Sequence, residues 1–282
     1  MKNDGGGTMA VVTSKDNRLV KQWRALCRDA HARRESGLYA IEGARLCEDA
    51  LRSGFAPQVL LYTAEARENY PETVEALRAA AEQAVEIAPS LSRAMADTVG
   101  PQGVFCTVRS PMALDDRPIL DKIDTTGRYV VLEDIRDPGN LGTMIRAAEA
   151  FGLNGLLLSD GCCDVGNPKV LRGSMGGVFR LPLLAAGSLP ETIAALQARG
   201  MTAYACVVDP GAWPVDTAGV TAPGSLCAIG NEGSGLRPET VAACAQCVTI
   251  RMAGRAESLN ASLAAGIVMW EMVRPCQSGD TE

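Results

Sequence analysis

From residue 129 onward, short apolar runs alternate with segments of helical periodicity, and this alternation limits the folds open to the chain. The runs cover residues 129–135, 155–158, 203–208, 226–229 and 248–252. Strands that are apolar on both faces belong to parallel sheets, which helices cover on either side. The second half of the chain therefore predicts an α/β domain with a mostly parallel sheet covered by helices.

Three blocks rich in glycine or in small polar residues follow three of these runs. They occupy residues 137–152, 229–236 and 257–264. Because open α/β sheets bind ligands at the loops beyond the carboxyl ends of their strands, we expect the blocks to converge on one site. Glycine lets a backbone approach a ligand closely, which suits a nucleotide-like molecule. The chain has no Gly-Lys dipeptide for a P-loop, and residues 230–235 reverse the dinucleotide spacing, so an ordinary kinase or dehydrogenase is disfavoured.

Charge is distributed unevenly along the chain. The net charge of −6 argues against a surface that binds nucleic acid everywhere, but a local basic stripe can serve alone. Residues 14–36 carry seven basic side chains against three acidic ones, and Leu19, Trp23 and Leu26 recur there at helical spacing. We expect an amphipathic helix with a basic outer face. This pattern fits a helix face that contacts nucleic acid, and it fits a helix face that contacts only solvent equally well.

The rest of the first half predicts a small α/β unit. We expect helices over residues 41–51, 72–83 and 91–98, and strands over 58–62, 85–87 and 104–108. Residues 109–127 are rich in proline and aspartate, which indicates a linker. The predicted divisions are a flexible tail (1–13), a first domain (14–108), the linker (109–127), a second domain (128–275) and a C-terminal tail (276–282).

Composition sets limits on compartment and metal content. The chain shows no signal peptide and no apolar run of the roughly 18 residues that a membrane helix needs, so we expect a cytoplasmic protein without a membrane partner. The ten cysteines are expected to stay reduced. With a single histidine, the chain is expected to hold no metal.

The three blocks together carry a specific pattern. It reads Asn140-x-Gly142-x-x-x-Arg146-x-Ala148, then Gly230-x-Glu232-x-x-Gly235-Leu236, then Ser258-Leu-Asn260-x-Ser262. Over residues 129–273 the chain resembles the SpoU-TrmH RNA 2′-O-ribose methyltransferases of the SPOUT class, which share three such motifs. Arg251 stands where the third motif usually has proline, and Ala261 where it usually has valine.

The resemblance implies a fold, a cofactor and partners. The C-terminal segment would thread into a deep trefoil knot, and the methyl donor S-adenosylmethionine (SAM) would bind against it. Enzymes of this class generally act as homodimers. The first domain resembles a ribosomal-protein-like domain that binds substrate RNA. The RNA partner that the resemblance favours is large-subunit ribosomal RNA. The residues then expected to contact RNA are Lys15, Arg18, Lys21, Arg24, Arg28, Arg136 and Arg172.

The resemblance also implies roles for single residues. Main-chain groups at Gly230, Ile250 and Leu259 would hold the adenosine of the donor, with the glycine keeping the strand end open. Ile250 and Leu259 fit the edge of the core as well. The residues implied in catalysis are Asn140, Arg146, Glu232, Ser258 and Asn260.

Arg146 is taken as central to catalysis in the family, often as general base. A guanidinium stays protonated in almost every protein environment. We therefore expect Arg146 to bind the RNA phosphate, and we expect Glu232 or the phosphate itself to accept the proton of the ribose 2′-hydroxyl. If a helix begins near Leu141, Arg146 projects towards the same loop. Asn140 and Asn260 also fit helix N-caps, and Glu232 also fits a buried structural carboxylate.

The leading hypothesis is SAM-dependent methylation of a ribose 2′-hydroxyl in RNA, most of all in ribosomal RNA. A transfer-RNA ribose methyltransferase is the nearest alternative. A non-catalytic RNA-binding factor of ribosome assembly with the same fold is another, although the intact motif residues argue against it.

Overall fold

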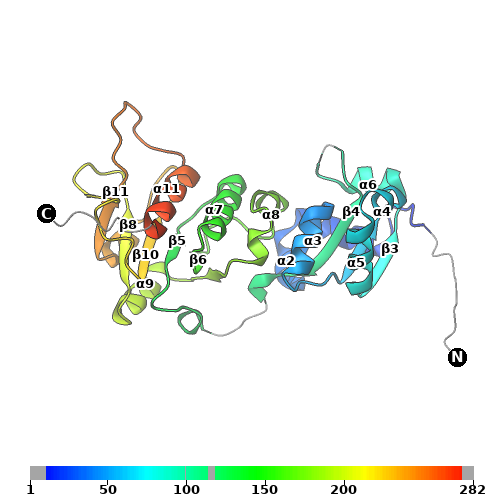
Figure 1. Cartoon of the computed structure of the whole chain (residues 1–282), viewed down its shortest axis with the longest axis horizontal. Coiled ribbons are helices and arrows are strands. Elements are labelled where there is room, and N and C mark those ends of the chain that lie inside the picture. Colours follow the sequence, from blue (N-terminus) through cyan, green and yellow to red (C-terminus); the bar gives the residue numbers. More distant parts are fainter. Residues whose placement is uncertain (1–10, 99, 114–117, 275–282) are drawn as a thin grey trace. The chain divides into compact units, whose positions relative to one another are not determined.

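The computed structural model describes residues 11–98, 100–113 and 118–274. Contacts divide the chain into two compact units (Figure 1). The first unit comprises Met1–Leu114 with Gly166–Pro168, and the second comprises Asp115–Val165 with Lys169–Glu282. The expected N-terminal tail, the centre of the linker and the C-terminal tail lie largely outside the described residues. The exact domain limits stay a prediction.

The first unit is a mixed sheet with strand order β1-β4-β2-β3. Strand β4 runs antiparallel to both neighbours, and β2 is parallel to β3. The strands are β1 (Leu38–Glu42), β2 (Val59–Tyr62), β3 (Gln83–Glu86) and β4 (Val104–Arg109). The helices are α1 (Arg18–Arg28), α2 (Ala30–Ser36), α3 (Ala44–Arg52), α4 (Ala64–Asn69), α5 (Pro71–Ala80) and α6 (Pro89–Met95).

One face of this sheet packs on α1 and α6 around Trp23, whose ring meets Phe105 edge-on with centroids 5.1 Å apart. Leu19, Trp23 and Leu26 are buried, which confirms the amphipathic pattern of the first segment. The segment is nevertheless two helices rather than one. Asp29 has an extended backbone, and its side chain accepts a hydrogen bond from the His31 amide at 2.8 Å, so α2 begins afresh.

The helix predicted over residues 41–51 starts later than expected. Ile41 and Glu42 pair with β4 as the end of β1, and α3 begins only at Ala44. Gly43 makes the turn between them with a φ of 100°, a conformation that favours glycine. The other predicted helices and strands of this unit are confirmed to within a few residues.

The second unit is a seven-stranded sheet in which each neighbouring pair of strands is parallel. The strand order is β7-β6-β5-β10-β8-β11-β9. The strands are β5 (Tyr129–Leu132), β6 (Gly155–Leu158), β7 (Leu183–Ala185), β8 (Thr202–Cys206), β9 (Trp213–Pro214), β10 (Ser225–Ile229) and β11 (Gln246–Thr249). The helices are α7 (Pro138–Ala150), α8 (Pro168–Gly173), α9 (Leu189–Ala198), α10 (Pro238–Ala243) and α11 (Ala261–Val273).

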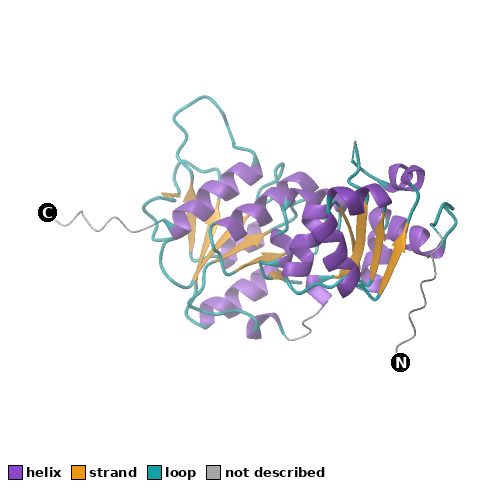
Figure 2. Cartoon of the chain, turned by 45° about the vertical axis from the view of Figure 1, so that its right-hand side comes forward, coloured by secondary structure: helices purple, strands orange, loops and turns teal. Residues whose placement is uncertain are grey.

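Helices cover both faces of this sheet, as Figure 2 shows. On one face, Leu189, Ile193 and Leu196 of α9 pack on alternate residues of β5 and β10. On the other, α7 and α11 pack against each other, α7 packs against β6, and α11 packs against β10. The predicted parallel α/β architecture is confirmed. Within the described part of the chain, each helix is too short or too polar to cross a lipid bilayer.

The direction in which strands are added changes at β5. After β5 the chain adds β6 and β7 on one side, then passes to β8, and β10 enters between β5 and β8. The loops after β5 and β10 therefore leave the same edge of the sheet side by side. Ligands bind at such a switch point in open α/β sheets. The deep trefoil knot stays a prediction.

Gly142 allows α7 and α8 to approach closely. A Cβ at this position would lie 2.9 Å from the Val170 carbonyl oxygen and 3.0 Å from the Gly173 Cα, both backbone atoms. Backbone atoms cannot yield as the end of a flexible side chain can. The close packing of α7 against α8 therefore requires glycine at position 142.

We predict that Gly142→Ala destabilises the protein by about 1–3 kcal/mol through this overpacking. Gly187→Ala in the loop before α9 is the matched control, because its Cβ would meet no atom within 4 Å. Alanine restricts the unfolded chain more than glycine does, so the control is expected to be as stable as the wild type or slightly more stable. Urea unfolding of both variants measures the difference, and wild-type stability of Gly142→Ala would contradict the close approach.

Candidate active site

The three motif loops meet through a short chain of side-chain hydrogen bonds. Asn140 Nδ2 donates to Glu232 Oε1 at 2.6 Å, and Asn260 Nδ2 donates to Asn140 Oδ1 at 3.1 Å. One residue comes from each sequence block, and they are separated by 92 and 120 positions along the chain. The predicted convergence of the blocks on one place is thus present in the geometry.

The sequence allowed Asn140 and Asn260 to be helix N-caps, and the structure shows only one of them in that role. The N-cap of α7 is Asp137, whose Oδ1 accepts from the Asn140 amide at 2.8 Å, so Asn140 is not the cap. Helix α7 begins at Pro138 rather than near Leu141. Asn260 does cap α11: its Oδ1 accepts from the amides of Ser262 and Leu263. The cap fixes the Asn260 side chain while leaving its Nδ2 for Asn140.

Gly230 lies where the loop of the second motif folds back on itself. Asn231 and Gly235 exchange two backbone hydrogen bonds of 3.1 and 2.9 Å, which folds the loop back on Gly230. A Cβ at position 230 would lie 2.1 Å from the carbonyl carbon of Gly235. The glycine is therefore required by a backbone contact within the second motif.

A buried carboxylate that sequence reasoning missed anchors this loop to the sheet. Glu133, directly after β5, is 2% exposed. It accepts from the Arg237 amide at 2.7 Å and from Thr240 Oγ1 at 2.6 Å. Glu232, by contrast, is exposed, so its interpretation as the buried structural carboxylate is wrong. The sequence feature that could have revealed the role of Glu133 is the pair of consecutive acidic residues at the end of an apolar run.

Asp134 adds a second anchor. Its φ of 55° is left-handed, and the Asn231 Nδ2 donates to its carbonyl oxygen at 2.7 Å. Its carboxylate accepts from Ser159 Oγ at 3.0 Å and from Arg237 Nη2 at 2.5 Å. Burial raises the pKa of Asp134, but the bonds from Arg237 and Ser159 and the nearby charge of Arg136 outweigh it, so the pKa lies below its usual value. The carboxylate contacts therefore contribute stability at neutral pH that is lost as the pH falls through this lowered pKa.

Arg146 and Ser258 lie outside the hydrogen-bond chain. Both are exposed, and neither makes a side-chain hydrogen bond or ion pair with the residues that the structure describes. Arg146 is eight residues beyond the first residue of α7, so it lies in the third turn of this helix. Arg136 is exposed in the loop after β5, whereas Arg172 is half-buried in α8.

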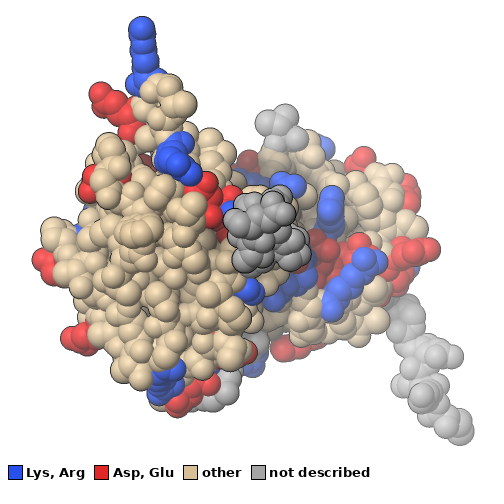
Figure 3. All heavy atoms as spheres, turned by 60° about the vertical axis from the view of Figure 1, so that its left-hand side comes forward, with Lys and Arg blue, Asp and Glu red and all other residues tan. Residues whose placement is uncertain are grey.

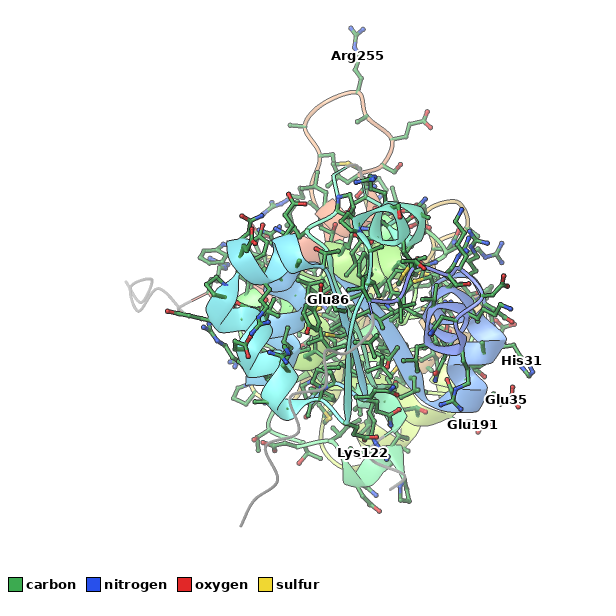
Figure 4. All side chains as sticks on the ribbon, turned by 90° about the vertical axis from the view of Figure 1, so that its right-hand side faces the viewer. His31, Glu35, Glu86, Lys122, Glu191 and Arg255 are labelled. Atoms are coloured by element: carbon green, nitrogen blue, oxygen red, sulfur yellow. The ribbon has the colours of Figure 1, made fainter. Side chains whose placement is uncertain are left out.

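The segment 250–259 between β11 and α11 offers free main-chain groups. Its backbone makes no hydrogen bond with the described residues. Ile250 and Leu259 at its two ends are half-buried rather than core residues. Arg251, which stands where proline is usual, binds the carboxylate of Asp216 at 2.9 Å. Figure 4 shows the segment projecting from the sheet with Arg255 at its tip.

The basic residues of the first unit lie on the outer side of α1 and just before it. Lys15, Arg18, Lys21 and Arg28 are exposed, and Arg24 is half-buried. Lys21 pairs with Asp16 at 2.7 Å, whereas the other four form no ion pair within the described residues.

A parallel sheet whose three motif loops meet at its switch point defines the second unit as an α/β domain with a ligand site at the carboxyl edge of its strands. The model of the SpoU rRNA Methylase family matches residues 127–270, and that of the MRM3-like substrate binding domain matches residues 17–106. The chain belongs to the SpoU rRNA methylase family.

Similar proteins match over nearly the whole chain. The 23S rRNA (guanosine(2553)-2′-O)-methyltransferase RlmP of Bacillus subtilis is 30% identical, over 94% of this chain and 99% of that protein. The 23S rRNA (uridine(2479)-2′-O)-methyltransferase of Streptomyces viridochromogenes is 32% identical, over 96% and 94%. Among solved structures, the AdoMet-bound rRNA methyltransferase from Sinorhizobium meliloti has a TM-score of 0.81 at 29% identity, covering 94% of this chain and 98% of that one.

We predict that Glu133→Ala destabilises the protein by about 2–4 kcal/mol, because it leaves one buried and one half-buried donor without an acceptor. Thr240→Val is the matched variant, since it removes one of those donors and nearly keeps the shape, so its cost is expected to be smaller. Thermal and urea unfolding give both values. A smaller loss for Glu133→Ala than for Thr240→Val would contradict the anchoring role.

Proposed function

We propose that this protein transfers the methyl group of SAM to a ribose 2′-hydroxyl of ribosomal RNA. The observation that carries the proposal is the bond chain from Asn260 through Asn140 to Glu232, which joins the three motif loops at the switch point. The relatives named above act on 23S rRNA by their names, and one similar structure holds AdoMet. We also propose a location in the cytoplasm.

The residues at the carboxyl edge fit SAM by their chemistry. The unbonded backbone of segment 250–259 can donate to and accept from an adenosine, and Ile250 and Leu259 offer half-buried apolar walls beside it. The folded loop after Gly230 would form a further wall. SAM supplies, when bound, an electrophilic methyl group on a positively charged sulfur.

The side chains of the bond chain would handle the ribose. Glu232 accepts one hydrogen bond at each oxygen, from Asn140 and Asn231, which holds the carboxylate in one orientation with lone pairs to spare. It would take the proton of the 2′-hydroxyl. Arg146, exposed and without a partner in the described residues, would bind the RNA phosphate and stabilise charge on the ribose oxygen. Ser258 would complete contacts to donor or RNA.

We predict that the wild-type protein transfers label from SAM to ribose in a ribosomal RNA pool and not in a transfer-RNA pool. Glu232→Gln is expected to lower the single-turnover rate by about 10²–10⁴-fold and to flatten its rise with pH, because the variant cannot accept the proton. Rapid-quench assays over a range of pH measure both effects.

Glu191→Gln is the matched control, since Glu191 is an exposed carboxylate in the first turn of α9 that forms no ion pair within the described residues. It is expected to behave as the wild type. An unchanged rate and pH profile for Glu232→Gln would remove Glu232 as proton acceptor. Label confined to transfer RNA would support the alternative substrate, and no label in either pool would support the assembly-factor alternative.

We also propose that two copies of the chain form a homodimer through the outer face of α11. This helix buries Ala265, Val268 and Met272 inward, yet Leu263 and Trp270 remain 54% and 51% exposed on the other side. A helix that is apolar all round is normally covered on all sides. The Trp270 ring also meets Phe151 at the end of α7, with centroids 5.8 Å apart. Figure 3 shows that uncharged residues cover most of the forward face of this unit.

We predict that Trp270→Asp converts a dimer into a monomer, because it places a charge in the apolar centre of the interface. Light scattering after size-exclusion chromatography measures the mass. Trp213→Asp is the matched control: its side chain is 61% exposed on β9, at the edge of the sheet. A monomeric wild type, or a dimer that survives Trp270→Asp, would contradict this interface.

A further inference from the structure

The first unit contains a polar cavity of about 310 Å³ that lies apart from the basic face of α1. It is formed where α2 passes into β1, beside the start of β2 and the end of β4. Its lining includes Arg34, Ser36, Gly37, Leu38, Gln58 and Arg109. Ligand pockets begin at about this size.

Backbone hydrogen bonds fix the floor of the cavity. Gly37 ends α2 in a left-handed conformation with a φ of 64°, and its carbonyl oxygen accepts from the Ser110 amide at 2.8 Å. Leu38 pairs with Arg109 in the antiparallel register of β1 and β4. The amide of Gln58 donates to the Thr107 carbonyl at 2.8 Å. The elements that carry the polar side chains are therefore held rigidly together.

The polar ends of three lining side chains are free. Arg34 and Arg109 are exposed and form no ion pair within the described residues, and the Gln58 carboxamide makes no hydrogen bond there. The hydroxyl of Ser36 is already used, since it donates to the Ala32 carbonyl at 2.6 Å and accepts from the Leu38 amide. Glu35 also lines the cavity, but it lies 3.8 Å from His31 Nε2, and Figure 4 shows both residues at the outer side of α2.

This set of groups matches one chemical class of ligand. Two guanidinium groups offer paired donors to a phosphate, and a carboxamide offers one donor and one acceptor to the edge of a base. Proteins that recognise RNA sequence usually bind unpaired nucleotides, whose bases are then free to stack on guanidinium planes and to form edge hydrogen bonds. We propose that this cavity binds one unpaired nucleotide of the substrate RNA, with Arg34 and Arg109 on its phosphate and Gln58 on its base.

The inference rests on the proposed function, because it names a contact between the substrate RNA and the first unit. All of the lining residues except Arg109 fall within residues 17–106, the part that matches a substrate-binding domain. The basic face of α1 would contact the RNA backbone without selecting a base. The cavity would add a contact that depends on an unpaired nucleotide.

The test compares two double variants of equal charge. Arg34→Gln with Arg109→Gln removes both guanidiniums of the cavity. Arg45→Gln with Arg93→Gln removes two exposed arginines of α3 and α6 that form no ion pair within the described residues. The probe is an unmodified large-subunit ribosomal RNA transcript. Filter binding at several salt concentrations gives the Kd, and labelled SAM gives KM for RNA and kcat.

We expect the cavity variant to raise Kd and KM for the RNA by about tenfold or more and to make the salt slope shallower, because both contacts to the bound phosphate are lost. Its kcat at saturating RNA is expected to stay at the wild-type value. The control variant is expected to match the wild type. Gln58→Ala is expected to raise Kd several-fold without changing the salt slope, since the carboxamide is uncharged.

A cavity variant with wild-type Kd and KM, or a control variant that weakens binding equally, would overturn the inference while leaving the proposed function intact. A wild-type protein that methylates no RNA would overturn the proposed function instead. In that event the difference in Kd between the two double variants still decides whether the cavity binds RNA. Circular dichroism and thermal unfolding confirm that each variant is folded before binding is compared.

Discussion

The buried carboxylate of Glu133 is the contact on which the geometry of the site depends. It binds the amide of Arg237 and the hydroxyl of Thr240, which lie 104 and 107 positions further along the chain. A buried carboxylate without such donors is costly, so the connection from β10 to α10 has one favoured position against β5. Glu232 belongs to that connection. Its 2.6 Å contact with Asn140 therefore follows from a bond made at the end of β5.

The bond chain through Asn140 has only one direction in which it satisfies every group. A carboxylate only accepts hydrogen bonds, so Glu232 requires the amide nitrogen of Asn140. This leaves the Asn140 oxygen for the amide nitrogen of Asn260, and the Asn260 oxygen for the first amides of α11. An aspartate in place of either asparagine would put two acceptors face to face. The residue types of three distant motifs are thus linked by donor and acceptor chemistry.

Local pattern was enough to predict much of this structure. The parallel sheet follows from the apolar runs, and the buried face of α1 follows from the helical spacing of Leu19, Trp23 and Leu26. Local pattern failed where a single polar side chain, or a partner far away in the sequence, determines the structure. The break between α1 and α2 depends on the cap at Asp29, and the end of β1 depends on pairing with β4. The role of Glu133 depends on partners more than a hundred residues away, which periodicity cannot show. The knot, the roles of single site residues and the domain limits stay predictions.

The distribution of ion pairs leaves several arginines of this acidic protein without an acidic partner among the described residues. Arg67 and Arg78 both pair with Glu75, whereas Arg18, Arg28 and Arg34 form no ion pair within the described residues. An unpaired guanidinium keeps all of its donors for a ligand phosphate. In the second unit Arg146 is likewise unpaired among the described residues, whereas Asn140, Glu232 and Asn260 bind one another. The arginines proposed to bind RNA thus have no fixed partner among the described residues, whereas the side chains proposed to meet the ribose hold one another in place. The arginines would therefore lose side-chain conformational entropy only when RNA binds.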